Sequence, residues 1–254
     1  MSLADIYVEM ERDFNELVQA RLKDAKTILS KYPQHFDDNF LISVIKSIFR
    51  EQKIHADSAL PEEEWKRIIN EKTLFHAILS WHIQLLYDHV APQSRWLDTN
   101  DVTSTPVQCN SRREFLVELI QILSQKSEAK SIEEKLTFKF KMAKQLGDKI
   151  ASTDMAALKD TETLGFIAII SSLLKYCCML MHLIFPSYKD PVVANKCTLG
   201  NSWYTLWSGK SLHTIYLEHA EATLAKIDAL RGLIENNVDI EVNEDEVRPL
   251  LGAS

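Results

Sequence analysis

Ser171, Lys175 and His182 interrupt the most apolar run of the sequence, and they are the side chains best suited to hold a ligand. The run is FIAIISSLLKYCCMLMHLIF, residues 166–185. At about 100° per residue, the three fall on one stripe of a helix that is apolar around the rest of its circumference. An ammonium group in apolar surroundings pairs with an anion or changes its pKa. The stripe therefore predicts a pocket in which Lys175, His182 and Ser171 receive an acidic or polar ligand group.

The same run has two other interpretations. It is about as long as a membrane-spanning helix, which needs about 20 residues. Its apolar residues favour insertion by roughly 3–6 kcal/mol, and Lys175 opposes insertion by roughly 2.5–3.5 kcal/mol. Insertion is thus near break-even, and we expect 166–185 to be the central helix of a water-soluble bundle. In such a bundle Lys175 can also reach solvent with its amine or pair with a glutamate of a neighbouring helix.

Histidines are the second group of residues that could do chemistry, by binding a metal. The stretch FHAILSWHIQLLYDH contains His76, His82 and His89. On one helix His82 and His89 share a face while His76 points about 120° away, so the three cannot bind one ion together. The spacings Glu-x-x-His and HExxH are absent from the sequence. We predict hydrogen-bonded, partly buried histidines and no metal site, with a site assembled from different helices, such as His82 with His182 or His219, left open.

No catalytic motif stands out in the sequence. GxSxG, the P-loop and GxGxxG are absent. Asp98 and Asp101 have the spacing DxxD in LDTND, but aspartates are common turn residues and this stretch is a predicted loop. The four cysteines include no CxxC pair, which removes the usual zinc and redox spacing. We therefore expect no cofactor, and we favour a non-enzymatic function over an enzymatic one.

The predicted helix 131–151 offers the clearest candidate surface for a partner. It opens with SIEE, a capping-box sequence. Phe138 and Met142 stand off its main apolar stripe, at spacing i, i+4, among Lys135 and Lys139. A basic face that carries an aromatic residue and a methionine suits an acidic helix, a membrane surface or a nucleic-acid backbone. The alternative is a helix buried on two sides, with lysine stems covering its edges.

The last predicted helix carries a heptad-like apolar seam. Its members recur at alternating spacings of four and three residues: Tyr216, Ala220, Thr223, Ile227, Leu230 and Ile234. The seam is short for an independent coiled coil, so we expect it to pack within the bundle. The alternative is a homodimer formed through the Tyr216–Ile234 seam.

Composition predicts that helices position all of these residues. Only six glycines occur in 254 residues, and good helix formers are plentiful. Apolar periodicity, caps and prolines predict a compact all-α bundle of seven helices: 2–30, 37–54, 61–90, 111–125, 131–151, 161–185 and 211–236. We expect one domain over 1–254, with the segment 91–110 as its internal boundary and 238–254 as a frayed acidic tail.

Charge and N-terminal sequence bound the functional class. The net charge is −7 with both signs mixed along the chain, which argues against a dedicated nucleic-acid binder. The first residues are acidic and lack the apolar region of a secretory signal, so we expect a cytoplasmic protein. The leading hypothesis is a non-catalytic helical module that binds another protein. The alternative is a bundle with an internal pocket for a small or lipid-like ligand, perhaps with catalysis, over which 91–110 acts as a lid.

Overall fold

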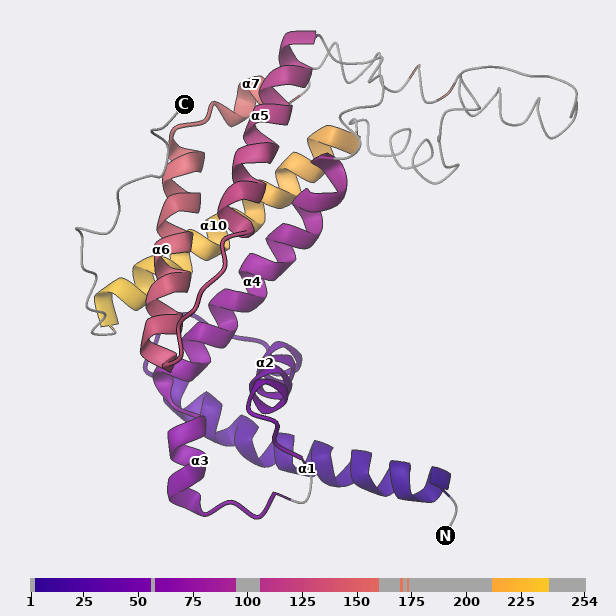
Figure 1. The fold of residues 1–254 in the computed structure, drawn as a ribbon, viewed down its shortest axis with the longest axis vertical. Helices are drawn as coiled ribbons and strands as arrows, with labels where there is room; N and C mark the ends of the chain where they lie inside the picture. Colours follow the sequence, from indigo (N-terminus) through magenta and orange to yellow (C-terminus); the bar gives the residue numbers. More distant parts are fainter. Residues whose placement is uncertain are drawn as a thin grey trace, which may run out of the picture. The chain divides into compact units, whose positions relative to one another are not determined.

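The computed structural model describes residues 3–55, 58–94, 106–159, 170, 173 and 212–237. Within these ranges the chain forms eight helices and no strand, which confirms the all-α class (Figure 1). The helices are α1 (Leu3–Leu29), α2 (Asp38–Glu51), α3 (Glu62–Ile68), α4 (Glu71–Ser94), α5 (Pro106–Leu123), α6 (Ile132–Ala151), α7 (Met155–Leu158) and α10 (Leu212–Asn237).

The helices group into two compact units, and each unit takes several separate stretches of the chain. The first unit consists of Met1–Ile83, Lys126–Lys144 and Ile227–Ser254, and the second consists of Gln84–Gln125 and Gln145–Lys226. The boundary between the units falls inside α4, α6 and α10, so each of these helices contributes to both. Residues 84–125 are grouped in one unit. The single domain over 1–254, with its internal boundary at 91–110, stays a prediction.

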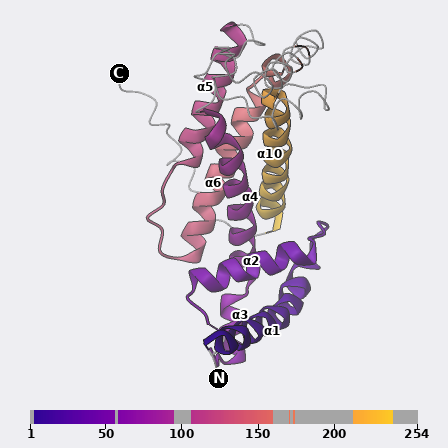
Figure 2. The same cartoon turned by 90° about the vertical axis from the view of Figure 1, so that its right-hand side faces the viewer.

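Apolar faces of α1 and α2 build much of the core of the first unit, and the two helices lie against each other (Figure 2). Ile45 and Phe49 on α2 are completely buried. The Phe49 ring meets Trp65 of α3 at 5.5 Å between centroids, and the Arg21 guanidinium of α1 lies 4.9 Å from the centre of the same indole. Aromatic packing and a cation–π contact thus hold α3 to α1 and α2.

The second unit packs α7 against α5. Arg112 of α5 is 1% exposed, and its Nε donates a hydrogen bond to the carbonyl oxygen of Leu158 at 2.6 Å. Lys149 of α6 forms an ion pair with Glu118 of α5, and Lys159 pairs with Glu221 of α10 at 2.6 Å. Charged groups therefore link α5, α6, α7 and α10, and apolar residues such as Phe115 and Leu119 of α5 are 3% and 0% exposed.

Most predicted helices in the described ranges are confirmed, with one division. The predicted helix 61–90 is two helices, because α3 ends at Ile68 with Ile69 as its C-cap and Asn70 begins a new helix, α4. The Asn70 side-chain oxygen accepts a hydrogen bond from Thr73 N at 2.9 Å, as an N-cap does. In addition, α4 continues to Ser94 and α5 already begins at Pro106, where proline suits the first turn of a helix.

The predicted central helix lies almost entirely outside the described residues. Of 166–185 only Ile170 and Leu173 are described; both are helical, and they are 44% and 49% exposed. The central position of 166–185 therefore stays a prediction. Among the helices that the structure describes, none has the length and apolar content needed to cross a membrane.

Candidate functional site

An aromatic cluster lies at the surface of the first unit, between the start of α2 and the middle of α4. We use the name aromatic cluster for Phe36, Phe40, Trp81 and His82. Phe36 stacks on Phe40 with centroids 6.1 Å apart, and Trp81 meets Phe40 edge-on at 5.9 Å. Trp81 is 42% exposed, while Phe36 and Phe40 are half-buried. The cluster therefore presents an exposed Trp whose indole is supported by Phe40.

Local hydrogen bonds fix the backbone and rings of the aromatic cluster. Asp37 caps α2 by accepting hydrogen bonds from Asn39 N at 3.0 Å and Phe40 N at 3.4 Å. This cap sets the position of the two phenylalanines that flank it. His82 Nδ1 donates to the carbonyl oxygen of Ile78 at 2.9 Å, since a carbonyl oxygen only accepts. The His82 ring is thereby held against Phe40, at 5.4 Å between centroids.

A polar seam runs between α4 and α6 in the first unit. We use the name polar seam for Thr73, His76 and Ser80 on α4 with Lys135 and Lys139 on α6. Thr73 and His76 are 7% and 8% exposed, and the Ser80 hydroxyl is buried without a hydrogen-bond partner among the described residues. Spacings of three and four place the α4 members on one face of that helix. Polar groups therefore line an otherwise apolar helix contact.

Burial and positive charge set the electrostatics of the polar seam. Burial lowers the pKa of His76, with Glu51 raising it and Lys139 and Lys135 lowering it further. Burial also lowers the pKa of Lys139. Lys135 Nζ meets Glu51 Oε1 of α2 at 2.5 Å. The seam thus combines three basic groups with one carboxylate, and that carboxylate is already paired.

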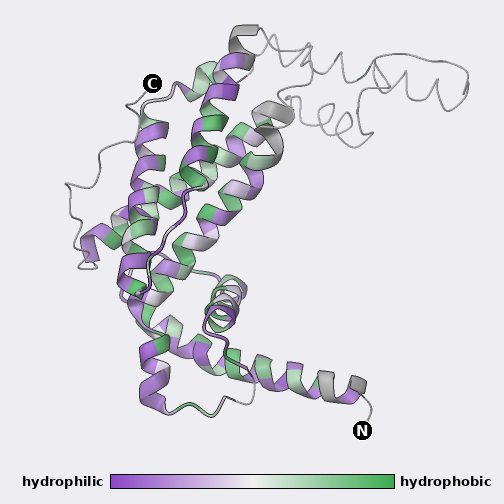
Figure 3. Ribbon diagram, in the orientation of Figure 1, coloured by the Kyte–Doolittle hydropathy of each residue, from purple (hydrophilic) through white to green (hydrophobic). Residues whose placement is uncertain are grey.

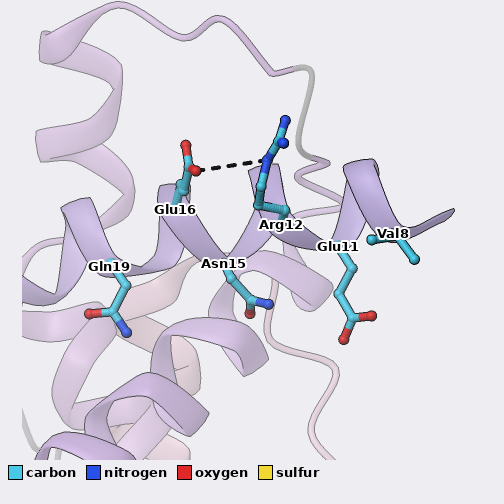
Figure 4. A pocket seen from close by; sticks show the side chains of 6 residues that line it. All are labelled: Val8, Glu11, Arg12, Asn15, Glu16 and Gln19. Carbon is cyan, nitrogen blue, oxygen red and sulfur yellow. Dashed lines mark ion pairs between the residues drawn. The ribbon is translucent and has the colours of Figure 1, made fainter. Parts of the chain in front are cut away.

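Two hollows lie on the first unit. One, of about 420 Å³, lies among the loop after α2, the helix α3 and the starts of α4 and α6, and its lining includes Lys53, Arg67, Thr73 and Ile132. The other is a shallow groove whose six lining residues all belong to α1, with Arg12 and Glu16 paired at 3.9 Å across it (Figure 4). A single helix builds the second hollow, so no other element encloses a ligand there.

The predicted partner surface on α6 is corrected at one position. Met142 is 1% exposed and belongs to the core, because the side of α6 that carries it is covered. Phe138, Lys135 and Lys139 are half-exposed. Figure 3 shows how apolar and polar residues alternate around α6. The alternative of a helix buried on two sides, with lysine stems at its edges, describes α6 better than an exposed Phe138/Met142 patch.

The structure describes the three histidines of α4 and the apolar seam of α10. His76 and His82 are buried and half-buried, and His89 stacks on His219 of α10 at 6.0 Å within the second unit. No group of three metal-ligating side chains occurs among the described residues. The α10 seam is covered inside the chain: Ala220, Ile227, Leu230 and Ile234 are at most 2% exposed. Lys175, His182 and Ser171 lie outside the described residues.

Neither the aromatic cluster nor the polar seam was predicted from the sequence. The sequence predicts a helix over 37–54 near Phe36 and Phe40, but it does not indicate that Trp81 lies beside them. His76 was placed on a separate face from His82 and His89, but the lysines of the polar seam come from α6, far along the chain. Comparison of the chain with protein-family models, curated proteins and solved structures finds no match.

Proposed function

We propose that this chain is a non-catalytic helical module that binds another protein through the aromatic cluster. The observation that carries the proposal is Trp81, which is 42% exposed and rests edge-on against Phe40, the ring that the other members of the cluster contact. Tryptophan is among the residues most enriched at the energetic centres of protein interfaces. A ring held by neighbours before binding loses little conformational freedom when a partner covers it.

The surroundings of the cluster suit a partner that offers apolar side chains. Phe36 and Phe40 form the apolar floor beside Trp81. Asp38, at the first turn of α2, is already paired with Lys26 of α1 at 2.6 Å. This acidic group beside the cluster is therefore already partnered within the chain, and we expect apolar contact to provide most of the affinity.

The test compares Trp81→Ala with Tyr87→Ala. Tyr87 lies on the same helix, is 37% exposed and is also aromatic, but it faces another side of α4. Partners are captured on the immobilised full chain, identified by mass spectrometry, purified and titrated against each variant. We expect Trp81→Ala to weaken binding by about 30-fold or more, as a hot-spot residue does, and Tyr87→Ala to leave it unchanged.

The proposal fails if both variants bind the purified partner with the affinity of the unchanged chain. The thermal unfolding midpoint of each variant is compared with that of the unchanged chain, so that a loss of binding can be distinguished from a loss of folding. The proposal includes action in the cytosol, which imaging of a tagged chain tests. The pocket hypothesis built on Lys175, His182 and Ser171 remains a separate prediction.

A further inference from the structure

The hollow of about 420 Å³ on the first unit has an apolar lining that a ligand could cover. Its volume lies within the roughly 300–1,000 Å³ of protein pockets that hold small molecules. Ile54 is 8% exposed, and Leu60, Ile68 and Ile132 are half-buried. These four residues come from the loop after α2, from α3 and from the start of α6. The hollow therefore has room and apolar contact surface for a small hydrocarbon group.

Two ion pairs between helices hold the walls of this hollow together. Lys72 of α4 pairs with Glu133 of α6 at 3.2 Å, and the two helices lie side by side there (Figures 1 and 2). Glu51, the last residue of α2, pairs with Lys135 of α6 at 2.5 Å. Each pair involves residues that neighbour lining residues in the chain. The end of α2 and the starts of α4 and α6 are thus tied to one another around the hollow.

Thr73 supplies a nearly buried hydroxyl to the lining. The residue is 7% exposed and belongs to the wall of the hollow. Its backbone N–H donates to Asn70, but its hydroxyl makes no hydrogen bond with a described residue. Buried polar groups are nearly always hydrogen-bonded, so a ligand with an acceptor oxygen suits this hydroxyl.

The charges of the lining favour an anionic ligand group. Its charged members are Lys53, Glu64 and Arg67, which are two cations and one anion. Glu64 pairs with Arg67 at 2.6 Å. Lys53 forms no ion pair with a described residue, and the nearby Glu51 already pairs with Lys135. Lys53 therefore carries positive charge that no described carboxylate offsets, and an anion in the hollow would offset it.

The backbone places Lys53 at the hollow in a conformation that favours glycine. Its φ is 56°, and the residue is exposed. It follows the C-cap of α2, where Ile54 N donates to the carbonyl oxygen of Phe49 at 2.9 Å. Glycine adopts this φ without a steric penalty, whereas lysine does not. Replacing Lys53 by glycine thus removes the ammonium group without adding backbone strain.

We infer that this hollow binds a carboxylate that carries a short apolar chain. Lys53 donates a charge-assisted hydrogen bond to the carboxylate, and the Thr73 hydroxyl donates a neutral one. The flexible stem of lysine allows its ammonium to reach the ligand from the exposed side. The apolar chain covers Ile54 and Ile132. The site shares no residue with the aromatic cluster, so its test is independent of the proposed function.

The test titrates sodium hexanoate into the full chain and follows the δ1 methyl signals of Ile54 and Ile132 by NMR. Each signal is assigned by its loss in Ile54→Val or Ile132→Val. Hexanamide has the same chain without the charge, and acetate has the charge without the chain. We expect hexanoate to shift both signals saturably, and the other two to bind at least about fivefold more weakly.

A further arm with N-acetyl-leucine distinguishes two sources of such a carboxylate. Hexanoate represents a free acid, whereas N-acetyl-leucine represents the carboxyl end of a peptide. Whichever of the two saturates the methyl shifts at the lower concentration identifies the source that the hollow prefers.

Three variants test the two polar residues. Lys53→Met keeps the backbone strain and removes the charge, and we expect about fivefold weaker binding of hexanoate. Lys53→Gly should lose the same affinity without a lower urea midpoint of unfolding, so that its loss is not lost folding. Thr73→Val keeps the shape and should bind about threefold more weakly. Lys23→Met, at an exposed lysine of α1, is the matched control and binds as the unchanged chain does.

The inference is overturned if hexanoate does not shift the Ile54 and Ile132 signals saturably. It is also overturned if hexanamide binds as tightly as hexanoate, or if Lys53→Met and Lys53→Gly bind hexanoate as the unchanged chain does. Either result means that the hollow does not recognise a carboxylate. The comparison of hexanoate with hexanamide on the unchanged chain decides the question even where a variant does not fold.

Discussion

At the scale of single residues, His76 is the side chain whose chemistry depends most on its surroundings. Burial is the main cause of its lowered pKa, and the lysines at positions 135 and 139 on α6 add to it while Glu51 on α2 opposes it. In the unfolded chain a histidine titrates near its ordinary value of about 6.5. The unfolded state therefore binds more protons than the folded state between the lowered pKa and about 6.5, and folding is weakened there.

This difference predicts a pH-dependent stability that His76→Gln removes. Above about pH 6.5 the ring is neutral in both states and carries no penalty; as the pH falls from there to the folded pKa, stability is lost. Each unit of lowering corresponds to about 1.4 kcal/mol of unfolding free energy. Urea unfolding at pH 7.5 and 5.0, in buffers without phosphate or carboxylates, measures the loss. We expect a smaller loss in His76→Gln, whereas His55→Gln, at an exposed histidine, should match the unchanged chain.

The residue types on α6 indicated a charged surface, but they did not indicate which residues of other helices lie beside it. Lys135 and Lys139 were singled out because they form a basic face around Phe138. In the structure Lys135 pairs with Glu51, and burial lowers the pKa of Lys139. Their neighbours Glu51 and His76 come from other helices, so spacing along one helix was not able to identify them. Met142 was misplaced for the same reason: the angular position was correct, but a second covered side of α6 buries it.

At the scale of elements, the start of α6 follows directly from the sequence. Ser131 Oγ accepts a hydrogen bond from Glu134 N at 3.1 Å, and Glu134 Oε2 accepts one from Ser131 N at 3.3 Å. Hydrogen bonds from the backbone of Lys130 and Ser131 lower the pKa of Glu134. This reciprocal pair is the capping box that the letters SIEE predict.

Removing the cap should destabilise the chain without changing its fold. Ser131→Ala leaves the Glu134 amide without its side-chain acceptor, and we expect a loss of about 1 kcal/mol in the free energy of unfolding. Ser124→Ala, an exposed serine in the same connection between α5 and α6, should change it by less than about 0.5 kcal/mol. Equal losses from urea unfolding of the two variants would argue against the capping role.

Helix ends were predictable where a cap or proline was the strongest local signal. The division at Asn70 was missed because the apolar periodicity continues through IINEK. The only local sign of a new helix is the Asn70 side chain, which accepts a hydrogen bond from Thr73 N. The short helix α7 was missed for a similar reason. Asp154 caps it by accepting hydrogen bonds from Ala156 N and Ala157 N at 3.1 and 3.2 Å, but one turn is too short to show a period.

At the scale of the whole molecule, the two units do not follow chain order. The first unit needs Lys126–Lys144 and the end of α10 as well as the N-terminal helices, and the second needs stretches on both sides of residue 125. Periodicity predicts helices but does not state which distant helices pack together, so the two-unit arrangement was not predictable from the sequence. The buried Leu136 and Ile234, 1% and 0% exposed, belong to stretches far from the N-terminal helices whose unit they complete.

Cutting the chain between residues 125 and 126 tests this arrangement. The cut lies in the exposed connection between α5 and α6, and neither fragment 1–125 nor fragment 126–254 contains all segments of either unit. We expect each fragment alone to lack a cooperative unfolding transition, because its apolar faces have no partners. Mixing the fragments should restore the helical signal and a cooperative transition, measured by circular dichroism at increasing urea. A full chain with a protease site at the cut, measured before cleavage, is the control. Cooperative unfolding of 1–125 alone would mean that α1 to α5 complete a core among themselves, since the buried apolar residues of α6 and α10 would then be dispensable for it.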